Sequence, residues 1–221
     1  MSKKTILSVL GLALGAVCIA GCGGIASIGT PTASEKEIPA EFAMGQTEGK
    51  IVVFASQSAW LKSPMDLRAE LTKSFEQAFE ERVRLKKERL IPYSDIVKLR
   101  MELAENERND AFKIASKLNA AYVLTVEVMD FELSTFAERD FFNGMIQTKS
   151  CLYDIKGDKL WPEDEGRVLT LGFEAEKGTA KSAVEKLSNA TAHCVTRYFY
   201  NCKQERFRIA EEQKEFDYYK W

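Results

Sequence analysis

The side chains that enzymes most often use for acid, base or nucleophilic chemistry are sparse in this chain. Its one histidine, His193, is followed directly by Cys194, a pair that elsewhere serves as base and nucleophile. The pair falls in a segment with helical periodicity, where adjacent side chains point about 100° apart and do not meet. We therefore expect His193 on the surface of a helix and Cys194 in the core.

An acidic run, Glu163-Asp164-Glu165, is the other candidate, because carboxylates bind calcium. A calcium loop needs ligands at alternating positions and a glycine at its turn, and this run has neither. The sequence also contains no phosphate-binding glycine loop, GxSxG motif or HExxH motif. It therefore predicts a solvated acidic turn, no metal, no cofactor and no catalytic residue. A hydrolase that uses paired acids is the remaining enzymatic alternative.

The charge balance argues against nucleic acid as a partner. The 221 residues include 31 Lys and Arg against 33 Asp and Glu, a formal net charge of -2, so no strong positive field attracts phosphates. With 45% hydrophobic and 29% charged residues, the composition is that of a folded chain. We expect one or two domains.

The N-terminus carries a secretion signal. Lys3 and Lys4 precede an apolar run over residues 6–20, which is typical of a signal peptide and shorter than the about 20 residues of a membrane-spanning helix. At its end, Ile19-Ala20-Gly21-Cys22 resembles the lipobox of bacterial lipoproteins, whose cysteine is acylated and becomes the new N-terminus. We therefore expect lipidation of Cys22. The alternative is ordinary cleavage that leaves Cys22 as a free thiol.

The remaining chain divides into a tether, a domain and a tail. By analogy with lipoprotein sorting in double-membrane bacteria, Gly23 after the lipidated cysteine indicates the outer membrane, with the protein facing the periplasm. Residues 22–49, rich in small and polar side chains and without a sustained period, predict a flexible tether on which Phe42 and Met44 dock to the domain. Residues 50–202 are expected to form the domain and 203–221 a charged tail.

Hydrophobic periodicity predicts the elements of the domain. Five strands are expected from short apolar or alternating segments, at residues 51–55, 90–92, 121–133, 145–155 and 166–174, with Pro92 ending the second near an edge of the sheet. Four helices are expected where apolar residues recur at helical spacing, at residues 65–83, 94–103, 111–118 and 179–200. This order predicts an α/β or α+β fold, in which helices cover a mixed sheet of about five strands.

Three cysteines fall in the domain, Cys151, Cys194 and Cys202. An odd number allows at most one disulfide among them. A bridge between Cys151 in the sheet and Cys194 on the covering helix is geometrically the easiest, and three buried thiols are the alternative that we expect.

Two stretches carry a family resemblance. Residues 115–124, ASKLNAAYVL, lead from a helix through a turn of small residues into a central strand. Residues 153–161, YDIKGDKLW, place Asp154 and Gly157 in a turn and Trp161 where it can pack the sheet against a helix. Both resemble the envelope lipoproteins related to the curli secretion channel subunit and to the activators of penicillin-binding proteins. The domain of that group is similar to the N-terminal domain of the Tol translocation protein.

The resemblance implies a non-catalytic, lipid-anchored protein that binds a periplasmic or outer-membrane partner. The alternative is a self-assembling subunit of an envelope secretion or transport complex, as the channel-like relatives imply. For the contact we predict the loop 135–142, because its phenylalanines can leave apolar surface for a partner. The expected contact residues are Phe136, Arg139, Asp140, Phe141 and Phe142. Alternatively, the phenylalanines cover the end of the sheet.

Overall fold

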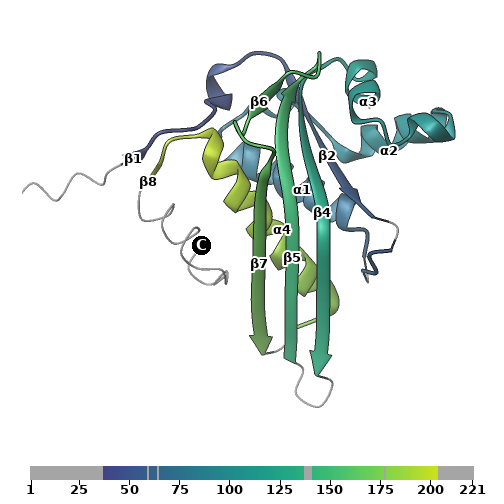
Figure 1. Ribbon diagram of the computed structural model, residues 1–221, viewed down its shortest axis with the longest axis vertical. Helices are drawn as coiled ribbons and strands as arrows, with labels where there is room; N and C mark the ends of the chain where they lie inside the picture. Colours follow the sequence, from purple (N-terminus) through teal and green to yellow (C-terminus); the bar gives the residue numbers. More distant parts are fainter. Residues whose placement is uncertain (1–36, 59, 64, 137–140, 177, 204–221) are drawn as a thin grey trace, which may run out of the picture. The chain divides into compact units, whose positions relative to one another are not determined.

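The computed structural model describes residues 37–203, except for residues 59, 64, 137–140 and 177 (Figure 1). The expected signal peptide, Cys22 and the tail beyond Lys203 lie outside the described residues, as do Arg139 and Asp140. Within them, a mixed sheet is covered by helices, which confirms the predicted fold class. None of the described helices is long and apolar enough to cross a bilayer.

Six strands form the central sheet of the described chain. Five neighbour one another in the order β3 (Leu90–Ile91), β2 (Lys50–Gln57), β4 (Ala120–Phe136), β5 (Phe141–Asp154) and β6 (Lys159–Trp161); β7 (Arg167–Glu176) also pairs with β5. β2 runs parallel to β3 and β4, whereas β5 is antiparallel to β4, β6 and β7. We did not predict β6, because three residues are too few to show a period.

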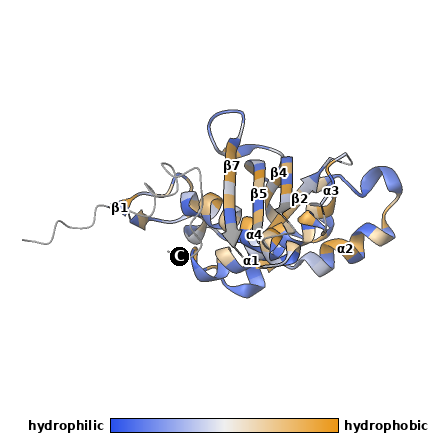
Figure 2. Cartoon of the chain, turned by 90° about the horizontal axis from the view of Figure 1, so that it is seen from below, coloured by the Kyte–Doolittle hydropathy of each residue, from blue (hydrophilic) through white to orange (hydrophobic). Residues whose placement is uncertain are grey.

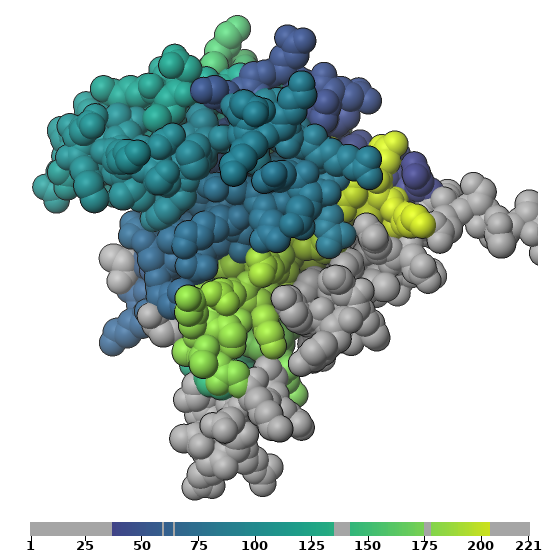
Figure 3. All heavy atoms as spheres, turned by 180° about the vertical axis from the view of Figure 1, so that it is seen from behind, coloured from purple at the N-terminus to yellow at the C-terminus, as the bar shows by residue number. Residues whose placement is uncertain are grey.

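Two helices cover one face of this sheet. α1 (Leu67–Glu81) and α4 (Ala180–Thr196) pack side by side over it, and Figure 3 shows their outer surface. α1 begins where the Asp66 carboxylate accepts a hydrogen bond from the backbone N–H of Arg68, at 3.1 Å. α4 begins with a capping box formed by Thr179 and Ser182. The apolar stripes of both helices face the main core.

Two shorter helices cover part of the other face. α2 (Tyr93–Glu102) and α3 (Ala111–Lys117) pack a second apolar cluster against β2 and the start of β4. Asn119 follows α3 with a φ of +54°, a left-handed conformation that asparagine tolerates better than most residues, and the chain then enters β4. Short 3-10 helices occur at Met44–Gln46, Lys87–Arg89, Glu105–Glu107 and Arg197–Phe199.

β4 and β5 are longer than the segments that periodicity predicted. They stay paired up to Phe136 and Phe141, so residues 137–140 connect them in place of the expected loop 135–142. A bulge between Val128 and Asp130 inserts a residue into β4 and shifts the alternation by one position.

Residues 37–49 fold onto the domain, although their composition predicted a tether. β1 (Glu37–Ile38) pairs antiparallel with β8 (Cys202–Lys203), which joins the two ends of the described chain. Met44 is fully buried, and the ring of Phe42 packs edge-on against Tyr122, with the centroids 6.3 Å apart. The folded part therefore begins no later than Glu37.

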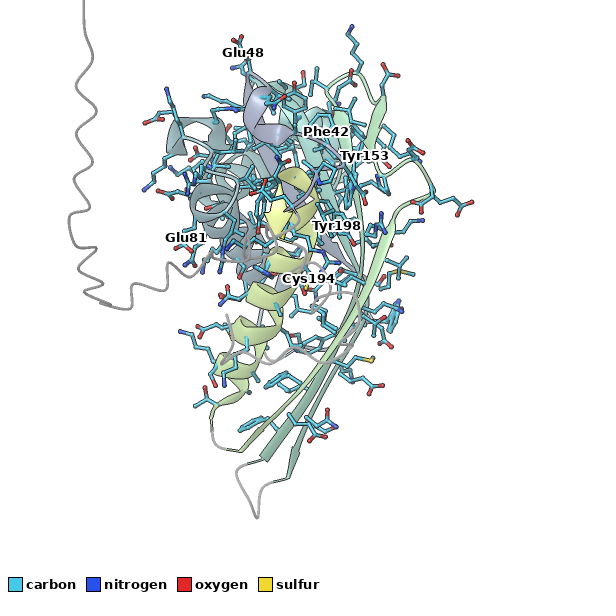
Figure 4. All side chains as sticks on the ribbon, turned by 90° about the vertical axis from the view of Figure 1, so that its left-hand side faces the viewer. Phe42, Glu48, Glu81, Tyr153, Cys194 and Tyr198 are labelled. Carbon is cyan, nitrogen blue, oxygen red and sulfur yellow. The ribbon has the colours of Figure 1, made fainter. Side chains whose placement is uncertain are left out.

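The structure corrects the expected position of His193, which is only 6% exposed. All residues from 190 to 199 are buried, because the end of α4 and the turn after it pack against α1 and the sheet together. Cys194 is buried in the core, as expected, and Figure 4 labels it on α4. Cys151 and Cys202 are buried too, and no disulfide joins these three cysteines.

Candidate partner-binding surface

Three strands of the sheet extend beyond the others. β2 ends at Gln57, opposite Val128, but β4 continues to Phe136 with β5 and β7 beside it. α4 covers one side of this extension through its contacts with β5 and β7, and α1 packs beside it on β2. Figure 4, in which the sheet is seen edge-on, shows the helices on that side and only side chains on the other. We call the uncovered side the open face; its residues are Glu127, Met129, Asp130, Glu132, Met145, Gln147, Lys149, Val168, Thr170, Gly172 and Glu174.

Alternation along β5 and β7, and along β4 on either side of its bulge, separates the open face from the core. Successive side chains of a strand point to opposite faces, and Figure 2 shows the result as bands of contrasting hydropathy along β4, β5 and β7. The inward residues, among them Val126, Ile146 and Leu171, are buried. Two apolar residues of the open face remain in water, Met129 at 39% exposure and Val168 at 50%. The open face is therefore polar with apolar side chains among the charges.

The open face is strongly acidic. Its carboxylates belong to Glu127, Asp130, Glu132 and Glu174, and no ion pair of theirs forms within the described part of the chain. Lys149 is its one basic residue and lies opposite Glu127 in the register. The Lys149 side chain lies instead over Gly166, the residue before β7, since a Cβ built on Gly166 would be 2.5 Å from the Lys149 Cε atom. Lys149 therefore forms no ion pair with the four carboxylates, and the open face has a net negative charge.

One position of the open face has no side chain. Gly172 lies opposite Met145, and a Cβ built on it would meet only the carbonyl oxygen of Gly144, at 3.7 Å, an ordinary contact. By contrast, a Cβ on Gly144 would lie 2.7 Å from the ring of Phe173. Packing therefore requires glycine at 144 but not at 172. A glycine in a strand interior often marks a place where another group approaches closely.

The expected contact loop is located at the far end of these strands. Phe136 and Phe141 are register partners at the end of the β4–β5 hairpin, and Arg139 and Asp140 lie outside the described residues. Phe142 is half-buried and packs against the main core. Its packing matches the alternative in which the phenylalanines cover the sheet, while partner contact by this loop stays a prediction.

Asp154 organises the turn that follows β5. One of its carboxylate oxygens accepts hydrogen bonds from the backbone N–H groups of Lys156, at 2.8 Å, and Asp158, at 2.9 Å. Gly157 adopts a φ of +94°, which favours glycine. This turn directs the chain into β6 and brings Trp161 back over the core.

Trp161 connects the turn to the N-terminal segment. Its side chain is 2% exposed and packs against Tyr198 and Phe199, and its indole N–H donates to the Glu41 carboxylate at 2.6 Å. Arg167 donates to the same carboxylate at 3.1 and 3.2 Å, and its guanidinium lies 4.6 Å from the centroid of the Tyr198 ring. Glu41 therefore holds residues 37–49 in place.

The carboxyl groups of Asp66 and Glu76 have shifted pKa values, and both groups lie outside the open face and have structural partners. Burial tends to raise the pKa of Asp66, but hydrogen bonds and the charge of Arg68 outweigh it and lower the pKa. Burial raises the pKa of Glu76, although its carboxylate accepts a hydrogen bond from the Tyr93 backbone N–H at 2.8 Å. Asp66 caps α1, and Glu76 binds the first N–H group of α2, so both carboxyl groups serve helix ends.

The acidic run Glu163-Asp164-Glu165 is exposed. Asp164 accepts a hydrogen bond at its backbone carbonyl from the ammonium group of Lys159. Among the described residues, no three His, Cys, Asp or Glu side chains are grouped so as to hold a metal ion.

Comparisons with known proteins give similar folds at low identity. A PelC dodecamer from Paraburkholderia phytofirmans is 12% identical, with a TM-score of 0.46, over 75% of this chain and 95% of that one. Lipoprotein GNA1162 from Neisseria meningitidis is 13% identical, with a TM-score of 0.40, over 68% of this chain and 99% of that one. The LpoB C-terminal domain from Salmonella enterica is 15% identical, with a TM-score of 0.34, over 58% of this chain and 86% of that one.

No protein-family model and no curated protein sequence matches the chain. Because the TM-scores are low, the function is inferred from the chain's own residues. Sequence reasoning missed the open face, although the alternation of residues 121–133 predicted one wet side. The signal was present in the outward positions of β4 and β7, but only the pairing of both strands with β5 brings Glu127, Glu132 and Glu174 to one surface.

Proposed function

We propose that this chain is a non-catalytic, lipid-anchored protein of the bacterial envelope that binds a periplasmic or outer-membrane partner. The observation that carries the proposal is the open face, a strand surface that the described helices leave uncovered. Met129 and Val168 stand exposed among its carboxylates. Exposed apolar side chains surrounded by polar ones are typical of protein contact surfaces.

The anchor follows from the sequence alone. Removal of residues 1–21 and acylation of Cys22, for example with palmitate, would hold the domain on the outer membrane, facing the periplasm. Each methylene of the lipid that is buried in the bilayer contributes about 0.8 kcal/mol to the free energy of membrane binding. In cells grown with an alkyne analogue of palmitate, Cys22→Ser should abolish labelling and release the protein from the membrane fraction. Cys18→Ser is the matched control and should leave both unchanged.

The position of Glu37 shortens the tether. With β1 paired to β8, residues 23–36 remain between the lipid and the domain. Fully extended, such a segment spans about 50 Å, and a flexible one averages about 20 Å. The partner should therefore lie in the same membrane or close to it.

Cross-linking in intact cells tests partner binding. The acylated protein is purified after cross-linking, and every covalently trapped species is identified. One recurring envelope protein supports the proposal; capture of no other protein contradicts it. Charge reversal at Arg139 and Asp140 in the same experiment tests the hairpin contact, which would be wrong if capture were unchanged.

Self-assembly is the second candidate, and two strand edges favour it. In the described sheet, no strand pairs with the outer edge of β7, and beyond Val128 the edge of β4 away from β5 is unpaired. Unpaired edges are templates for strands of another molecule. A ladder of self-multiples after cross-linking, without a foreign protein, would favour this function over the first.

A further inference from the structure

We propose that the open face is the docking site for a lysine- or arginine-rich, amphipathic segment of the partner protein. The inference rests on the partner-binding function proposed above and specifies the chemistry of the partner. It is carried by three features of the open face: its charge, its exposed apolar side chains and the missing side chain at Gly172.

The charge selects a basic occupant. Four carboxylates, those of Glu127, Asp130, Glu132 and Glu174, face one base, Lys149, and none of the four is neutralised by an ion pair of the described chain. Facing charges of opposite sign raise the association rate and exclude acidic partners. A basic segment therefore fits the open face, and an acidic one is repelled.

The register shows how the charges are arranged. Glu127, Asp130 and Glu132 form a column along β4, and Glu174 stands on β7 across β5 from that column. Neighbouring strands lie about 4.8 Å apart, so the column and Glu174 are separated by about 10 Å across the sheet. A segment that lies over β5 would have carboxylates on both sides.

The middle of the open face offers the apolar contacts. Met145 and Gln147 of β5 lie between the outward residues of β4 and β7; Met129 is in the bulge of β4, and Val168 lies opposite Lys149. Methionine side chains adapt to partners of different shape. Opposite Met145, Gly172 leaves space that the chain's own packing does not fill. We assign this space to an apolar side chain of the incoming segment, with its basic residues on either side.

Peptide binding to the full mature chain, residues 22–221, tests the proposal. The probe is a fluorescent ten-residue peptide that alternates lysine and valine, and its counterpart alternates glutamate and valine. The lysine peptide should bind at least about tenfold more tightly than the glutamate peptide. Its affinity should fall as salt increases, because exposed charges are screened. Equal binding of the two peptides would overturn the proposal.

Two variants locate the binding. Glu127→Lys with Glu132→Lys should weaken the lysine peptide about tenfold. The matched control, Glu102→Lys with Glu105→Lys, changes the net charge equally at exposed positions away from the open face and should change the affinity less than about twofold. Equal losses in both double variants would indicate only net charge and would refute the site.

Gly172→Val separates docking from folding. Valine favours strands, and its Cβ meets no close neighbour here, so the unfolding midpoint should stay the same or rise. The peptide should nevertheless bind several-fold more weakly, about fivefold, because the space beside Met145 is filled. Unchanged affinity in a folded Gly172→Val variant would remove Gly172 from the site.

Cross-linking in cells distinguishes this inference from the proposed function. If the foreign partner is captured by wild type but not by Glu127→Lys with Glu132→Lys, both stand. If both proteins capture it equally, the open face is not the docking site, although partner binding holds. If neither captures a partner, the proposed function itself fails.

Discussion

Glu41 is the residue whose replacement tests most directly how the N-terminal segment is held. Its carboxylate accepts the indole N–H of Trp161 and two contacts from the guanidinium of Arg167. We expect Glu41→Ala to lower the free energy of unfolding by about 2 kcal/mol. The main part is the buried indole N–H left without an acceptor, which costs about 1–3 kcal/mol.

The charge contributes less than the hydrogen bond. The Glu41–Arg167 pair is partly exposed, with relative side-chain exposures of 39% and 31%, so solvent screening leaves about 0–1 kcal/mol. Glu41→Gln keeps an acceptor for the indole and loses only the charge. It should therefore lower the free energy of unfolding by less than about 1 kcal/mol.

Urea denaturation of the mature chain, followed by far-UV circular dichroism, measures both variants. A loss of about 2 kcal/mol corresponds to a decrease in melting temperature of about 4–8 °C for a chain of this size. Glu48→Ala is the matched control, since Glu48 is exposed in the same segment and has no ion pair in the described chain; its stability should be unchanged. If Glu41→Ala were as stable as Glu48→Ala, our account of the N-terminal contact would be refuted.

Three further predictions concern local structure. Asp66→Ala should lower the free energy of unfolding by about 1 kcal/mol at pH 7, because it removes the cap of α1. The pKa of Asp66 is lowered in the folded state, so this stabilisation is present above about pH 4 and is lost as the pH falls through the folded pKa. Urea titrations should therefore show a smaller difference between wild type and variant at pH 3 than at pH 7. Gly144→Ala should cost about 1–3 kcal/mol in the same assay, because its Cβ would overlap the Phe173 ring, whereas Gly172→Ala should cost nothing. Gly157→Ala should cost about 1 kcal/mol through its positive φ, and a neutral result would contradict the role given to this turn.

The elements that periodicity predicted well are those that bury one regular face. The segment 121–133 alternates because β4 has one side in the core, and residues 65–83 show a helical stripe because α1 packs on the sheet. Both patterns are local, so one sequence reveals them. β6 is too short to show such a pattern, which is why this strand was missed.

The site depends on contacts between distant parts of the chain. Glu132 and Glu174 come to one surface because β4 and β7 both pair with β5, and no local pattern encodes that pairing. Glu41 and Trp161 are likewise 120 residues apart. Burial of His193 depends on how the end of α4 packs, whereas its helical phase alone predicted exposure.

The sequence by itself predicted a secretion signal and a lipid anchor at Cys22, and it determined the fold class and most helices and strands, because each depends on neighbouring residues or on a short period. Only the tertiary structure decided where the folded part begins, that His193 is buried, and which strands share the open face. These features arise from packing and pairing over long sequence separations, where burial of a few side chains such as Met44 outweighs local composition.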